Sequence, residues 1–91
     1  MPVTFVNADT LVRTGAAVIY WVTYLNHSAA SMAQTIWDNT AASGTKVNAS
    51  RLLATTMAYC VFEPPIRCGT GIYVQYGGAG GELYVFWAPL T

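Results

Sequence analysis

Few side chains in this sequence could do chemistry, and their spacing does not group them. His27 is the single histidine, and a catalytic triad would need one of four carboxylates to orient it: Asp9, Asp38, Glu63 or Glu82. These carboxylates are isolated from one another along the chain, so paired acid–base chemistry has no visible basis. The sequence therefore predicts no catalytic residues and no enzyme, and we interpret His27 as a solvated loop histidine.

The two cysteines, Cys60 and Cys68, stand outside any CxxC motif. Our interpretation is two buried or half-buried thiols, with a disulfide between neighbouring strands as the alternative. One histidine and two cysteines cannot complete a tetrahedral zinc shell within one chain. The sequence predicts no metal site.

A glycine-rich stretch, Tyr76 to Glu82, superficially resembles a phosphate-binding loop. A phosphate loop is followed directly by the N-terminus of a helix, whereas a strand-like segment, Leu83 to Trp87, follows here. We expect a hairpin loop and no cofactor. Asp38 and Asn39 are typical of a structural turn in which the side chains bond to nearby backbone N–H groups.

The composition narrows the class of protein more than the motifs do. Of 91 residues, 54% are hydrophobic and 9% are charged, against a usual charged fraction of about 25%. This excludes disorder, and the balanced charge excludes electrostatic binding of nucleic acid. The apolar run Ala16 to Leu25 is too short for a spanning helix, which needs about 20 residues. We expect no membrane, no secretory signal and assembly in a cytoplasm.

Segments rich in β-branched and aromatic residues alternate with turn residues along the whole chain. This pattern predicts an all-β fold, an antiparallel β-sandwich (jelly-roll-like or Ig-like) with about seven to eight short strands in one domain, 1–91. Residues 1–14 are a candidate N-terminal arm that could add a strand to a neighbour. The strand-like segments are Val3 to Val6, Leu11 to Arg13, Val18 to Leu25, Met32 to Trp37, Met57 to Phe62, Ile72 to Tyr76 and Leu83 to Trp87.

Alternate residues of a strand face opposite sides, so a polar residue marks the outer side. Thr23, Gln75 and Glu82 mark it here. Val18, Tyr20, Val22 and Tyr24 are then expected inside and Ile19 outside. The outer face would also carry five large apolar residues: Trp21, Leu25, Tyr73, Tyr84 and Phe86.

Two interpretations of these five residues stand. They are ordinary exposed side chains or lie under a loop, or they form a protein–protein interface. The scarcity of charge along the whole chain favours the interface, because interfaces are enriched in aromatic residues and depleted in charge. We therefore expect a homo-oligomer.

Three segments in order resemble small virion proteins of tailed bacteriophages. They are Ile36 to Val47 (IWDNTAASGTKV), Pro65 to Val74 (PIRCGTGIYV) and Gly81 to Trp87 (GELYVFW). In that group, a turn containing (G/N)-(T/S)-A-A-S-G-T precedes a P-I…G-(I/L)-Y strand and a final aromatic strand. The sequence departs from the pattern at Trp37, where Tyr is usual, and at Cys68.

The resemblance implies a β-sandwich present in many copies on a virus particle, assembled in the host cytoplasm. It implies a capsid decoration (cement) protein, with a trimer favoured and the major capsid protein as partner. Nucleic acid and membranes are not expected as partners. The alternative is the base of a head fibre or tail attachment, or a receptor- or carbohydrate-binding module that uses exposed aromatic residues.

Overall fold

The computed structural model describes residues 2–27, 29–52, 55–77 and 81–90, and in them it confirms the all-β fold. The hairpin loop expected within 76–82 lies largely outside the described residues, because 78–80 are not among them. Eight strands follow one another: β1 (Val3–Val6), β2 (Thr10–Thr14), β3 (Ala17–Asn26), β4 (Met32–Asp38), β5 (Thr45–Leu52), β6 (Met57–Cys68), β7 (Gly71–Gly77) and β8 (Gly81–Pro89).

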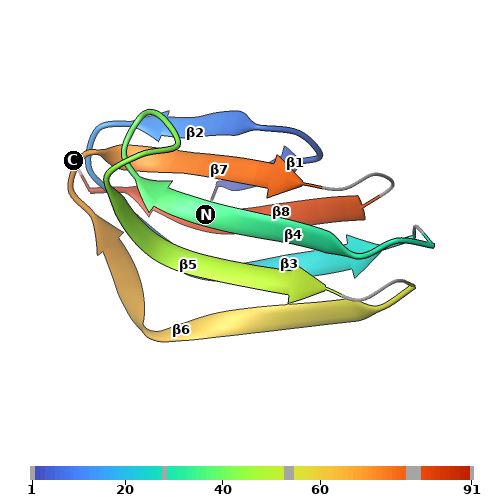
Figure 1. Cartoon of the computed structure of the whole chain (residues 1–91). Helices are drawn as coiled ribbons and strands as arrows, with labels where there is room; N and C mark the ends of the chain where they lie inside the picture. The colour runs from blue at the N-terminus through green and yellow to red at the C-terminus, as the bar shows by residue number, and fades with distance from the viewer. Residues whose placement is uncertain (1, 28, 53–54, 78–80, 91) are drawn as a thin grey trace.

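The strands form two stacked antiparallel sheets, with the orders β1-β8-β3-β6 and β2-β7-β4-β5 (Figure 1). We call them the first and the second sheet. The first strand pairs with the last, β2 with β7, β3 with β6 and β4 with β5. This is the pairing of one long hairpin folded over on itself, which is the jelly-roll topology.

The core lies between the sheets and is made of the inward side chains of both. In β7 and β8 the alternation is the one that Gln75 and Glu82 predict, with Tyr76 and Trp87 packing against the core. Fully buried apolar residues include Val6, Ala17, Ile19, Val22, Ile36, Cys68, Ile72, Val74, Leu83 and Val85.

The first half of β3 departs from the predicted alternation. Ile19, expected outside, has 0% of its surface exposed and packs in the core. Tyr20, expected inside, is half-buried and lines an outer hollow beside Pro64 and Pro65. Val18, also expected inside, is buried at 8% exposure but lines the same hollow and lies outside the central core cluster. The reason is a β-bulge, because the register with both neighbouring strands shifts between Ile19 and Trp21. An extra residue reverses the faces of every side chain before it.

The N-terminal segment pairs within its own chain. β1 lies against β8 and β2 against β7, so both halves of the candidate arm are edge strands of the sandwich. Asn48 lies in β5, at the edge of the second sheet.

The turn between β6 and β7 is held by a carboxylate from a distant strand. Asp38 accepts hydrogen bonds from the backbone N–H groups of Gly69, Thr70 and Gly71, at 3.0, 2.8 and 3.3 Å. Gly71 is required there, because a Cβ atom on it would lie 2.5 Å from the carbonyl oxygen of Arg13. Asp38 was predicted to bond to nearby backbone N–H groups, whereas the bonds reach a turn on a strand connection 31 to 33 residues further along the chain.

Candidate functional site

The outer side of the first sheet forms an apolar surface across all four of its strands, which we call the apolar face. The register places its residues in cross-strand rows: Val3–Phe86–Trp21–Val61, then Phe5–Tyr84–Thr23–Tyr59, then Glu82–Leu25–Met57. The apolar face therefore consists of nine residues: Val3, Phe5, Trp21, Leu25, Met57, Tyr59, Val61, Tyr84 and Phe86.

Two aromatic pairs make the middle of the apolar face rigid. Trp21 stacks on Phe86 with ring centroids 4.4 Å apart and an angle of 22° between the planes. Phe5 and Tyr84 are tilted, with centroids 5.3 Å apart. Because these contacts already hold the four rings in place, burying the rings under a partner costs little further side-chain entropy in this protein.

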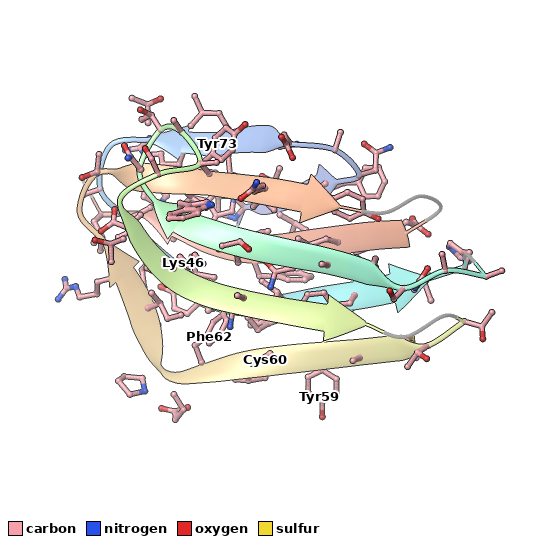
Figure 2. The ribbon with its side chains drawn as sticks, viewed as in Figure 1. Lys46, Tyr59, Cys60, Phe62 and Tyr73 are labelled. Atoms are coloured by element: carbon pink, nitrogen blue, oxygen red, sulfur yellow. The ribbon has the colours of Figure 1, made fainter. Side chains whose placement is uncertain are left out.

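Exposure is greatest where the apolar face reaches the edge strand β6. Met57 is 71% exposed, Tyr59 74% and Val61 56%. Figure 2 shows Tyr59 pointing away from the sandwich, whereas Phe62 points between the sheets. The small side chain of Thr23 leaves a shallow hollow of about 410 Å³ lined by Trp21, Thr23, Tyr59 and Val61.

One corner of the apolar face is polar. Glu82 forms a hydrogen bond with His27 Nε2 and accepts a hydrogen bond of 2.7 Å from the hydroxyl of Tyr84. The hydrogen bond with His27 has the largest effect on the pKa of Glu82. Together with the hydrogen bond from Tyr84, it holds that pKa below its usual value. The contact connects the start of β8 to His27, the residue after β3. The carboxylate of Glu82 therefore lies at the rim of the apolar face.

The contact between His27 and Glu82 was not predictable, since 55 positions separate them in sequence. In a catalytic triad, His27 would be the base and Glu82 the acid that orients it. Among the described residues, no hydroxyl or thiol is hydrogen-bonded to His27 as a nucleophile would be. The geometry is therefore that of a hydrogen bond between two side chains at the surface.

Four of the five residues predicted for the interface lie together on the apolar face. Trp21, Leu25, Tyr84 and Phe86 are half-buried neighbours in β3 and β8. Tyr73 is separate, because it lies on the outer side of the second sheet, opposite Leu11 and Trp37.

Sequence reasoning missed the outer residues of β1 and β6. The segment Met57 to Phe62 contains no polar side chain to mark its outer side, and Val3 and Phe5 lie in the segment considered as an arm. The available signal was the alternation itself. It separates Met57, Tyr59 and Val61 from their neighbours without saying which set faces water.

The outer side of the second sheet differs in character. The Lys46 ammonium lies 5.4 Å from the centre of the Trp37 ring, and the indole N–H of Trp37 donates to Gln75 Oε1 at 3.2 Å. Figure 2 shows Lys46 on β5 and Tyr73 on β7 of this sheet. Polar groups therefore interleave with its aromatic residues.

The two cysteines are free thiols at separate places on β6. Their partners on β3, Val22 for Cys60 and Ala17 for Cys68, are five residues or about 16 Å apart. A disulfide needs Cα atoms within about 7 Å, so the two cannot pair with each other. Burial, with a smaller effect from Asp38, raises the pKa of Cys68 to about 11 and makes it a poor nucleophile.

Metal sites and membrane-spanning helices are both absent from the part of the chain that the structure describes. The described residues hold no group of three or more His, Cys, Asp or Glu side chains placed to bind a metal ion. They also form no helix of the length and hydrophobicity that a bilayer span requires.

Topology and surface together define the class, a small jelly-roll sandwich with one apolar outer face. No family model, curated protein or solved structure matches the chain.

Proposed function

We propose that this protein is a structural assembly protein, which acts by burying its apolar face against other protein subunits. The observation that carries the proposal is the apolar face itself. Nine apolar side chains in register over four strands are interrupted by Thr23 and bounded by Glu82. Soluble monomers rarely expose a contiguous apolar patch of more than a few hundred Å².

The energetics favour a stable contact. Full burial of one side chain of this size contributes about 1.5–3 kcal/mol. The three most exposed residues, Met57, Tyr59 and Val61, would gain most of that amount. Association costs about 4–15 kcal/mol, so a stable contact requires several residues of the apolar face to be buried together.

The assembly that we propose is a virus particle, with the protein as a capsid decoration protein and the major capsid protein as its partner. Two observations support this role. One is that three motifs in this order resemble those of small virion proteins of tailed bacteriophages. The other is the jelly-roll pairing, an architecture that viral capsid domains use and that supports the role by analogy of fold. Many weak contacts per particle would act together through multivalency.

Carbohydrate binding is the second candidate, since Trp21 and Tyr59 flank the hollow over Thr23. A sugar would stack on these rings. Ligand sites, however, place several convergent polar groups for orientation, and this hollow offers the two hydroxyls of Thr23 and Tyr59. The surface therefore favours a protein partner.

The direct test of the role is quantitative mass spectrometry of virus particles purified from the source of the gene. We expect the protein in many copies per particle, at a fixed ratio to the major capsid protein. Its recovery in the soluble fraction, with none in the particles, would contradict the role.

A charged substitution tests the apolar face itself. Phe86→Asp should leave the fold intact and lower incorporation into particles at least about tenfold, because an unpaired charge would be buried in the contact. Ala33→Asp, on the exposed outer side of the second sheet, is the matched control and should incorporate normally. Equal incorporation of the two variants would rule out the apolar face as the contact.

A further inference from the structure

Each sheet ends in two edge strands, and three of the four edges carry features that block pairing with another chain. β1 has four residues, which is too short for an extensive ladder. β2 carries Arg13 and a register shift, and β5 carries Lys46 and another shift. Short length, charge and bulges are the usual protections of an exposed edge.

The edge of β6 has none of these features between residues 57 and 61. Its register with β3 is regular there, and Met57 to Phe62 contains no charged residue and no proline. The irregularity begins at the next residues, where Glu63 and Pro64 follow. β6 lies at the border of the first sheet, with β3 as its one partner among the described strands (Figure 1).

The hydrogen-bond pattern fixes which backbone groups of β6 face outward. Asn26 donates its N–H to the carbonyl of Thr56 at 2.9 Å, so these two residues form a hydrogen-bonded pair. Because such pairs alternate along an antiparallel ladder, residues 58 and 60 also bond to β3. The N–H and C=O groups of Met57, Tyr59 and Val61 therefore point away from the sheet.

We propose that β6 pairs with β6 of a second copy of this chain, antiparallel and centred on Tyr59. In this register Tyr59 faces Tyr59 of the second copy, and Met57 faces its Val61. All outward groups of the regular stretch are then used, in six backbone hydrogen bonds. The two Glu63 side chains lie at opposite ends of the paired strands, so like charges do not meet.

The edge of β6 is complementary to a second copy of itself. A two-fold contact requires a surface that matches itself, and a charge-free strand that alternates about one tyrosine does so. The result is a continuous eight-stranded sheet in which both apolar faces point to the same side. This inference rests on the proposed function for its use, because the doubled face would give a divalent contact with a larger assembly.

A two-fold contact closes at two copies, so the trimer implied by the sequence resemblance would need another surface. Light scattering of the isolated protein distinguishes a dimer from a trimer. At about 100 μM, we expect a mass of twice the 9.8 kDa of one chain. A monomer, or a trimer that persists after the edge is blocked, would overturn the proposal.

Tyr59→Pro blocks the edge specifically, since it removes an outward N–H that β3 does not use. It should raise the dissociation constant of the dimer at least about tenfold. Phe5→Pro is the matched control on the opposite edge. Trp87 donates its N–H to the carbonyl of Pro2, so by alternation Phe5 also points its N–H outward. It should leave the dimer unchanged, and equal effects would contradict the proposal.

A second pair of variants covers the case in which proline prevents folding. Tyr59→Lys places a charge in the paired edge and should give monomers, whereas Phe5→Lys should not.

The register is tested by Tyr59→Cys in a Cys60→Ser background. We expect a disulfide-linked dimer on oxidation, and none for Val3→Cys in the same background.

Failure of this inference is separable from failure of the proposed function. A wild-type monomer that is still incorporated into particles, through a contact sensitive to Phe86→Asp, would remove the dimer and leave the proposed function. A dimer that is absent from particles would contradict the proposed function and leave the dimer in place.

Discussion

Asp38 shows how one side chain determines the geometry at an end of the sandwich. Its carboxylate binds three consecutive backbone N–H groups of the turn that joins the two sheets. Burial raises the pKa of this carboxyl group, and the three bonds together outweigh burial and hold the pKa below its ordinary value. Its neighbour Asn39 acts locally, donating to the carbonyl of Ser43 at 2.9 Å.

The lowered pKa of Asp38 predicts loss of stability in acid. The ionised form makes the bonds, so their contribution is present above the unfolded pKa of about 3.9 and falls as pH drops through the folded pKa. Asp38→Asn should lower the free energy of unfolding at pH 7 by about 1–3 kcal/mol. It should also flatten the dependence on pH below 5, as urea denaturation at several pH values would show.

Asp9→Asn is the control for this prediction. Asp9 accepts a single backbone N–H, from Tyr76 at 2.8 Å, and it lies in an exposed turn. Its substitution should cost less than that of Asp38. Equal losses would show that the turn at 69–71 does not depend on the Asp38 carboxylate.

At the scale of elements, β3 marks how far the sequence could predict the structure. The second half of the strand, from Trp21 to Leu25, follows the alternation that Thr23 indicates. The first half does not, because the bulge after Ile19 depends on the register with β6 and β8. A register between strands far apart in sequence is a tertiary property that local alternation does not contain.

The bulge can be tested with two substitutions in the same strand. Ile19→Ala should lower the free energy of unfolding by about 2–5 kcal/mol, since it opens a cavity in the core. Leu25→Ala, which truncates a half-buried residue on the apolar face, should cost clearly less. Thermal or chemical denaturation would measure both, and the opposite ranking would restore the simple alternation.

A buried polar cluster links the two sheets at their other end. Gln34 of β4, 2% exposed, donates its side-chain amide to Tyr24 Oη of β3 at 3.1 Å and to Asn48 Oδ1 of β5 at 2.7 Å. Gln34→Leu should lower the free energy of unfolding by about 1–3 kcal/mol, because Asn48 and Tyr24 lose a buried partner. Unchanged stability in urea denaturation would contradict that role.

At the scale of the whole molecule, the composition and the pattern of the sequence predicted the general architecture. The location of the site depends on how the strands pair in three dimensions. Scarce charge and alternating apolar segments indicated a sandwich with a covered face, and the structure confirms the all-β sandwich. The nine residues of the apolar face come from both ends and the middle of the chain. They meet because β1 and β8 pair across the whole sequence, which no local pattern encodes.

The central claim is that the apolar face is covered by protein in the native assembly. Hydroxyl-radical footprinting tests it most directly, because it compares the reactivity of each side chain in the particle and in the isolated chain. Met57, Tyr59 and Phe86 should be protected in the particle, while Tyr73, on the opposite sheet, should react in both states. Equal reactivity of Met57, Tyr59 and Phe86 in the two states would contradict the account.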